Sequence, residues 1–225
     1  MIVTLDGPAG AGKSSTAREL ARRLGWCHMD TGAMYRSVAL VATRSGVPLD
    51  DERRLAEIVG RMRIEFRQGE VWVDGVEVTR DIRTPEITAA TRPVANAPLV
   101  RAAMKEVQRR LARDIDVVTE GRDQGSEVFP DAELKVFLTA SPEERARRRL
   151  ADERRHGRDT TLEEILASQE ERDHGDTHRD VGAMRRPDGA ELLVTDGMGP
   201  EEVILTLLAW VEARKQDRKS TRLNS

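Results

Sequence analysis

The sequence lacks several features that mark whole classes of protein. It has a single cysteine, Cys27, among 225 residues, which excludes an internal disulfide framework and a cysteine-rich zinc site. It has no long apolar run, so we expect neither a signal peptide nor a membrane-spanning helix, and hence a cytoplasmic protein. The net charge is only -3, without the basic excess of most nucleic-acid-binding proteins. The expected partners therefore include neither nucleic acid nor membrane.

The residues that are present alternate between strand-like and helix-like segments. Short apolar runs of strand length lie at residues 2–5, 26–29, 115–119, 134–138 and 192–195. Longer helical patterns lie at Lys13–Leu24, 32–43, Pro142–Arg155 and 200–214. Strands separated by helices are typical of a parallel sheet that is covered on both faces. We therefore predict an α/β fold with a parallel five-stranded sheet and helices on both sides.

One segment breaks the alternation. Residues 62–78 show period-two hydrophobicity around Gly69 and around Asp74 and Gly75, which predicts an antiparallel meander with two tight turns. Such a meander does not fit inside a parallel sheet, so we interpret residues from about 60 to 100 as a small insert. The following stretch is rich in Thr and Pro, and helix is expected to resume only near Leu99.

The end of the sequence carries no periodic pattern. Residues 215–225 are polar, and we expect them to form a disordered or foreign tail outside the fold. The remaining residues, 1–214, are then expected to form a single domain.

A phosphate-binding pattern follows the first apolar run. Residues 7–14 read Gly-Pro-Ala-Gly-Ala-Gly-Lys-Ser and fit G-x-x-x-x-G-K-[ST] between a strand and a helix. Glycines let backbone N–H groups approach phosphate oxygens, and the helix N-terminus adds its positive dipole end. We expect Lys13 to reach the β- and γ-phosphates of ATP and the Ser14 hydroxyl to ligate Mg²⁺. The expected nucleotide-binding residues are Gly7, Pro8, Ala9, Gly10, Ala11, Gly12, Lys13, Ser14 and Ser15.

Further motifs narrow the class of P-loop protein. The sequence has neither the Asn-Lys-x-Asp of guanine-binding proteins nor the Leu-Ser-Gly-Gly-Gln of transporter ATPases. It has Asp-Ile-Arg-Thr at 81–84, Glu-Arg-Asp at 171–173, and two longer motifs. These are Asp-Thr-Gly-Ala-Met-Tyr-Arg at 30–36 and Glu-Gly-Arg-Asp-Gln-Gly at 120–125. In this order, from Ile2 to about Trp210, the sequence resembles the bacterial cytidylate kinases, which are P-loop nucleoside monophosphate kinases.

The resemblance implies an activity and a set of parts. A monomeric enzyme would transfer the γ-phosphoryl group of ATP to CMP or dCMP, with the insert binding nucleotide and a short arginine-bearing lid at about 149–160. Glu120 takes the place of the carboxylate that holds Mg²⁺ directly or through water. Most arginines of residues 147–158 would equally suit a solvated helix face paired with glutamates.

The resemblance also implies roles for individual residues. Thr31, Arg36 and Arg122 would hold the acceptor phosphate, while Arg101 and Asp123 would face the cytosine edge. The remaining acceptor-pocket residues would be Tyr35, Asp176 and Arg179. The residues expected to stabilise the transferring phosphoryl group are Lys13, Arg122, Arg149, Arg154, Arg172 and Arg179.

Arg92 departs from the family pattern, because we expect a serine that touches the base at this position. Strictness for cytosine over uracil therefore stays open, as does the preference between ribose and deoxyribose. The alternatives are a kinase for UMP or another nucleoside monophosphate, a kinase for a hydroxyl-bearing metabolite, and a non-catalytic nucleotide-binding module. A hydroxyl acceptor would require a general base, and no motif here supplies one.

Overall fold

A five-stranded parallel sheet forms the centre of the computed structural model, which describes residues 1–67, 69–155, 157 and 159–223. Its strand order is β2-β6-β1-β7-β8. The strands are β1 (Ile2–Asp6), β2 (Cys27–Asp30), β6 (Val117–Gly121), β7 (Leu134–Thr139) and β8 (Glu191–Val194). Every predicted apolar run is a strand, with ends shifted by one or two residues. The predicted α/β fold is confirmed.

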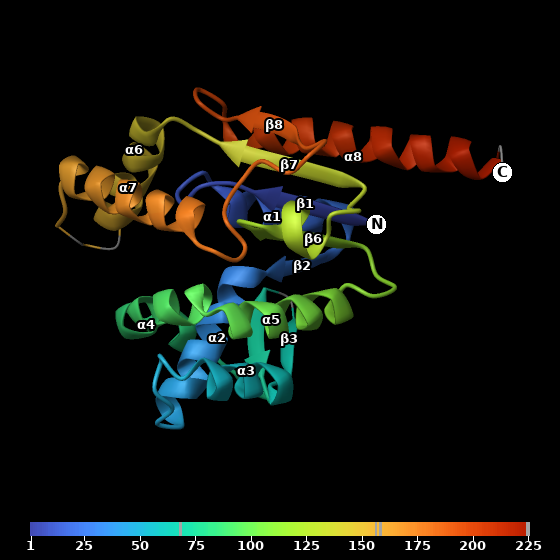
Figure 1. The fold of residues 1–225 in the computed structure, drawn as a ribbon. Helices are drawn as coiled ribbons and strands as arrows, with labels where there is room; N and C mark the ends of the chain where they lie inside the picture. Colours follow the sequence, from blue (N-terminus) through green and yellow to red (C-terminus); the bar gives the residue numbers. More distant parts are fainter. Residues whose placement is uncertain (68, 156, 158, 224–225) are drawn as a thin grey trace.

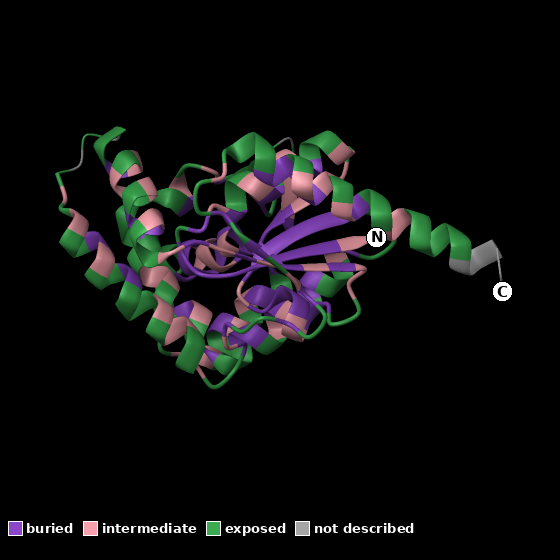
Figure 2. Cartoon of the chain, turned by 90° about the horizontal axis from the view of Figure 1, so that it is seen from above, coloured by how far each residue is buried: buried purple, intermediate pink, exposed green. Residues whose placement is uncertain are grey.

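Helices lie on both sides of this sheet (Figure 1). On one side, α1 (Lys13–Leu24) and α8 (Pro200–Leu223) bury Leu20 and Leu207 against strand residues such as Leu5. On the other side, α2 (Thr31–Arg44) and α5 (Pro98–Leu111) share a second core cluster with Met29 and Val117. Figure 2 shows buried strands at the centre of the molecule, and β1 and β6 are buried along almost their whole length. Each fully buried Leu or Met stabilises the fold by about 1.5–3 kcal/mol.

The insert contains the predicted meander. Strands β3 (Ile64–Arg67), β4 (Glu70–Val73) and β5 (Val76–Glu77) form a separate antiparallel sheet in that order. Helix α3 (Glu52–Arg61) precedes it and a 3-10 turn, η1 (Asp81–Arg83), follows it.

The expected late return to helix after the meander is wrong. Helix α4 already spans Pro85–Asn96. Thr84 caps it by accepting a hydrogen bond from the Ile87 N–H at 3.3 Å, and Pro85 fits the first helical turn, where no N–H is needed. Ile87 and Val94 are buried, so tertiary packing outweighs the cost of Pro93 inside the helix.

Two helices carry the arginine-rich region. Helix α6 spans Pro142–Arg155 and α7 spans Leu162–His178. Earlier in the chain, a π-helical turn, η2 (Gln124–Val128), follows β6. The predicted lid at 149–160 thus covers the end of α6 and the segment before α7; residues 156 and 158 lie outside the described residues. None of the helices described is both long enough and apolar enough to cross a lipid bilayer.

The tail expected from residue 215 was disordered or foreign; residues 215–223 are not disordered, because α8 continues through them to Leu223, and nothing in the helix bears on a foreign origin. This segment contains neither Gly nor Pro, so nothing in it breaks the helix. Lys215 pairs with Glu212 at 2.7 Å, and Arg218 pairs with Glu133 at 2.5 Å. Residues 224 and 225 lie outside the described residues.

Candidate active site

The phosphate-binding loop connects β1 to α1. Gly7 has a φ of 144°, and a Cβ atom at this position would lie 2.0 Å from the Leu138 carbonyl oxygen, so only glycine fits. Gly12, with a φ of 88°, stands directly before the first helical residue, Lys13. The loop therefore has the geometry that directs backbone N–H groups and a helix N-terminus toward an anion.

Lys13 lies buried beneath this loop, where its Nζ donates a hydrogen bond to the Pro8 carbonyl oxygen at 2.6 Å. Burial, followed by the nearby charge of Arg122, lowers the pKa of Lys13 to about 7, although Glu120 and Asp6 oppose the shift. A polyphosphate in the loop would favour the charged ammonium form. Lys13 thus lies within the loop that is expected to bind phosphate.

Ser14 and Glu120 come from different elements and meet beside Lys13. The Ser14 hydroxyl donates a hydrogen bond to Glu120 Oε1 at 2.8 Å. Burial, and then the charge of Asp30, raise the pKa of Glu120. A hydroxyl and a carboxylate are oxygen ligands of the kind that Mg²⁺ prefers, so this pair fits a divalent cation.

The acceptor side of the site begins at the ends of β2 and β6. Thr31 opens α2 and donates through Oγ1 to the Glu120 carbonyl oxygen at 2.7 Å. Asp30 caps α2 by accepting from the Ala33 N–H at 2.7 Å and lies 3.5 Å from the Arg36 guanidinium. These contacts bring Thr31 and Arg36 to the edge where Arg122 leaves β6.

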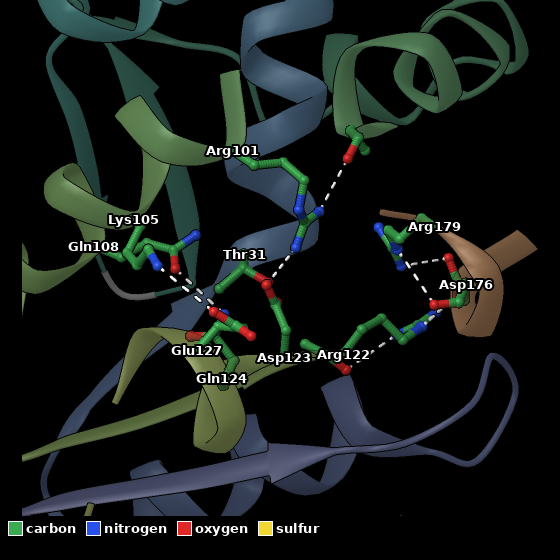
Figure 3. Close-up of polar contacts among 12 residues, drawn as sticks. Thr31, Arg101, Lys105, Gln108, Arg122, Asp123, Gln124, Glu127, Asp176 and Arg179 are labelled. Atoms are coloured by element: carbon green, nitrogen blue, oxygen red, sulfur yellow. Dashed lines mark hydrogen bonds and ion pairs between the residues drawn. The ribbon is translucent and has the colours of Figure 1, made fainter. Parts of the chain in front are cut away.

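Arg122 and Arg179 both turn toward the carboxylate of Asp176 (Figure 3). Arg122 Nε donates to one Asp176 oxygen at 2.7 Å, and Arg179 Nη2 donates to the other at 2.6 Å. Burial disfavours this carboxylate, but the charges of Arg122 and Arg179 outweigh it and lower the pKa of Asp176. Asp176 therefore holds two guanidinium groups side by side, as a dianionic phosphate requires.

Arg101 and Asp123 form a buried ion pair on the other side of the acceptor region (Figure 3). Arg101 also donates to the Ala95 carbonyl oxygen at 2.9 Å, and its guanidinium carbon lies 5.6 Å from the centre of the Tyr35 ring. Burial raises the pKa of Tyr35 to about 12, so its hydroxyl stays neutral. The Arg101 guanidinium and the Asp123 carboxylate thus lie together, so the pair offers both a hydrogen-bond donor and an acceptor to the polar edge of a base.

A single cavity of about 1220 Å³ joins the two sides. The predicted site residues that line it are Ala9, Gly10, Gly12, Lys13, Ser14, Ser15, Thr31, Tyr35, Arg36, Arg101, Glu120, Arg122, Asp123, Arg149, Arg172, Asp176 and Arg179. Gly7, Pro8 and Ala11 belong to the loop without lining the cavity, and Arg154 is exposed at the end of α6. Arg148 and Arg155 line the cavity although the sequence did not single them out.

Contacts that the sequence did not predict connect α6 and α7 to the phosphate-binding loop. Arg145 of α6 is buried and donates through Nη1 to the Ala9 carbonyl oxygen at 2.9 Å and to Asp173 at 2.6 Å. Asp173 in turn accepts from the Ala9 N–H at 3.4 Å. Both residues occur within motif-like stretches, but their partner lies more than 130 positions away in the chain. Spacing alone therefore could not identify them.

Arg92 lies next in the chain to Thr91, which lines the cavity. Its Nη1 forms an ion pair with Glu171 of α7 at 2.8 Å, and both side chains are exposed. Thr91 and Ala95 line the cavity beside it, whereas Arg92 does not. The residue that departs from the expected serine thus connects the insert to α7.

The chain is similar to known proteins over most of its length. Residues 3–213 match the family model described as cytidylate kinase. A cytidylate kinase of Rhodopirellula baltica is 48% identical over 203 residues, which cover 90% of this chain and 89% of that protein. A cytidylate kinase of Geobacter sulfurreducens is 41% identical over 220 residues, which cover 96% of this chain and 94% of that protein.

Two other similar proteins match over only part of their length or at low sequence identity. A bifunctional pantoate ligase/cytidylate kinase of Synechococcus sp. (strain JA-3-3Ab) is 44% identical over 209 residues, and the match spans 90% of this chain but 39% of that protein. The solved structure of TT1252 from Thermus thermophilus has a TM-score of 0.50 and 23% identity, with 95% of this chain and 96% of that chain covered, and supports the fold alone. By the match of residues 3–213 and the identity to its relatives, the chain belongs to the cytidylate kinase family.

Proposed function

We propose that the protein transfers the γ-phosphoryl group of ATP to CMP or dCMP, giving CDP or dCDP. Family membership supports ATP-dependent phosphorylation of a nucleoside monophosphate and disfavours a hydroxyl acceptor or a non-catalytic module. The observation that carries the choice of acceptor is the buried pair of Arg101 and Asp123, in the same cavity as the phosphate-binding loop.

The Arg101–Asp123 pair is complementary to cytosine. Cytosine offers an N4 amine as donor, and N3 and O2 as acceptors, which match a carboxylate and a guanidinium. The Arg101 guanidinium has five N–H donors, and its hydrogen bonds to Ala95 and Asp123 use one each from Nη1 and Nη2, so donor capacity remains for the base. Uracil would direct O4 toward Asp123 and N3–H toward Arg101, and such a mismatch costs about 1–3 kcal/mol per bidentate contact.

The transfer needs positioning and charge stabilisation more than proton transfer. The second pKa of a phosphate monoester is about 6, so the acceptor oxygen is already mostly ionised near pH 7 and needs no general base. Lys13, Arg122 and Arg179 offset the repulsion between the two phosphate groups. We therefore assign Asp123 to recognition of the base. Ser14 and Glu120 would hold Mg²⁺, which supplies charge neutralisation at the β- and γ-phosphate oxygens.

The remaining parts of the proposal concern closure and organisation. Residues 1–214 would act as one monomeric kinase domain, with the insert at about 60–100 and the lid at about 149–160. Arg149, Arg154 and Arg172 would approach the phosphates when the lid closes and expels water. Arg149 and Arg172 already line the cavity, which supports this assignment.

The test is a panel of acceptors with ATP and Mg²⁺, followed by release of ADP. CMP and dCMP should give the highest kcat/KM among CMP, dCMP, UMP, AMP and shikimate. Asp123→Asn should lower the CMP/UMP ratio of kcat/KM by about ten-fold, because the amide can no longer accept from N4 at both oxygens. Asp131→Asn, an exposed aspartate after the same loop, is the matched control. Fastest turnover of shikimate, or no transfer to any monophosphate, would refute the proposed function.

A further inference from the structure

Asp6 is the last residue of β1 and stands directly before Gly7 of the phosphate-binding loop. Its side chain is completely buried. Each carboxylate oxygen accepts one backbone hydrogen bond, from the Gln124 N–H to Oδ1 at 2.8 Å and from the Gly125 N–H to Oδ2 at 2.7 Å. Asp6 therefore fixes the start of η2 from the neighbouring strand.

The hydrogen bond from the Gln124 N–H to Asp6 constrains Asp123, the residue proposed to recognise the base. The Gln124 N–H belongs to the peptide group that follows Asp123, so Asp6 fixes the plane of that peptide and with it the direction of the Asp123 side chain toward Arg101. The Gln124 side chain is also held, because Thr119 Oγ1 donates to its Oε1 at 2.9 Å. Its Nε2 donates to Gln108 at 3.2 Å (Figure 3).

The second bond requires a close approach of two backbone segments. A Cβ atom at Gly125 would lie 2.8 Å from Thr4 Oγ1 and 3.2 Å from Asp6 Oδ2. Glycine at this position lets the loop descend onto β1. Because both partners of Asp6 are N–H donors, an ionised carboxylate satisfies them and an amide side chain cannot.

Keeping this carboxylate buried is costly. Burial raises the pKa of Asp6 to about 7 against the effect of its two hydrogen bonds; the charge of Asp123 raises it further, while Lys13 opposes. A group needed only to fill space would be better served by an apolar residue. The buried Asp6 carboxylate lies where the phosphate-binding loop and the loop that follows Asp123 meet.

We propose that Asp6 is a positioning residue for acceptor selection, which orients Asp123 through the backbone of Gln124 and Gly125 and so sets discrimination between cytosine and uracil. The inference rests on the proposed phosphorylation of CMP. Asp6 itself would touch neither nucleotide.

Asp6→Asn tests the inference with ATP as donor and CMP or UMP as acceptor. We expect the CMP/UMP ratio of kcat/KM to fall about ten-fold, as for loss of a bidentate base contact. KM for CMP should rise more than KM for ATP, since the loop that follows Asp123 is displaced. Thr4→Val is the matched control on the same strand: the Thr4 hydroxyl has no partner among the described residues, and this variant should keep the parent ratio.

A double-variant cycle separates positioning from a general loss of order. If Asp6 acts through Asp123, combining Asp6→Asn with Asp123→Asn should lower the CMP/UMP ratio no further than Asp123→Asn alone. Additive losses, an unchanged ratio in Asp6→Asn, or equal rises in both KM values would overturn the inference.

The folded state of each variant is checked by thermal unfolding, and Asp6→Ser, which is smaller and keeps one acceptor, is the second variant. If neither variant folds, Asp6 serves folding and the inference is overturned. If the parent protein does not phosphorylate CMP, the proposed function is refuted. If the parent does phosphorylate CMP but Asp6→Asn keeps the parent CMP/UMP ratio, only the role of Asp6 is refuted.

Discussion

Asp6 and Lys13 are buried ionisable groups of opposite sign on either side of the phosphate-binding loop. The pKa of each lies near 7, raised for Asp6 and lowered for Lys13, with burial as the first cause in both cases. Each site therefore disfavours the charged form of its own residue. Such perturbed groups gather at functional sites. A bound polyphosphate would restore the charge on Lys13 while leaving Asp6 to hold the neighbouring loop.

Asp6 should make stability depend on pH. Its pKa is about 7 when folded, against an ordinary value of 3.8, so between these values the folded state binds more protons than the unfolded state. Its contribution to the free energy of unfolding is therefore present at low pH and is lost as pH rises toward 7. Asp6→Asn removes this dependence, so the unfolding free energy of the variant minus that of the parent should increase from about pH 5 to about pH 7.5.

Urea unfolding of both proteins at constant ionic strength measures this difference. Thr4→Val, on the same strand, should show a difference from the parent that does not change with pH. A flat difference for Asp6→Asn as well would contradict the raised pKa of Asp6.

At the residue scale, sequence reasoning reached the residues that belong to local patterns. Lys13 and Ser14 follow from one continuous motif, and the structure brings Ser14 to Glu120 as the chemistry requires. Asp6, Arg145 and Asp173 were out of reach because each contacts a loop residue, Gln124 or Ala9, that lies more than 110 positions away. Their role depends on burial and on contacts between elements, which one sequence does not display.

At the scale of elements, an ion pair connects α4 to α7. Arg92 and Glu171 are exposed by 62% and 68%, so their pair contributes at most about 1 kcal/mol and is screened by salt. We expect Arg92→Ala and Glu171→Ala each to raise KM for CMP by up to about five-fold at low ionic strength. The double variant should be no worse than either single variant, since both remove the same contact.

Steady-state kinetics at low and high salt check this expectation, with Arg110→Ala, an exposed arginine of α5, as the control. The competing interpretation is that Arg92 touches the base. In that case Arg92→Ala would change the CMP/UMP ratio while Glu171→Ala would not, and the bridging role would be refuted.

Elements were predictable where hydrophobic periodicity is strong. The five strands and the meander were found because their apolar residues alternate or cluster within a few positions. Helix α4 was missed because Thr and Pro have low helix propensity, and the burial of Ile87 and Val94 that stabilises it is a tertiary effect. The extension of α8 was missed because a polar segment without periodicity can still continue a helix that has already formed.

At the scale of the whole molecule, the parallel sheet brings the two proposed nucleotide sites together. The carboxyl ends of β1, β2 and β6 lead into the phosphate-binding loop, Thr31 and Arg122, all on one edge. The sequence predicted this meeting because each motif follows a strand. It could not predict how α4 and α7 face each other across the cavity, since that depends on packing between the insert and the core. A net charge of -3 likewise conceals a cavity lined by several arginines.

One cavity of about 1220 Å³ is lined both by the phosphate-binding loop and by the residues of the proposed acceptor pocket, so a compound that joins adenosine and cytidine through five phosphates should bind as a unit. Once one half is bound, the other binds intramolecularly, so Kd should be at least about 100-fold lower than that for CMP alone. Calorimetry measures the affinity, and the unfolding temperature should rise with it. Lys13→Ala should lose most of the gain, because it removes the cation beneath the phosphate chain. A uridine analogue should bind about ten-fold more weakly, as the base-reading pair requires. If the linked compound bound no better than ATP, the two sites would not be aligned for in-line transfer.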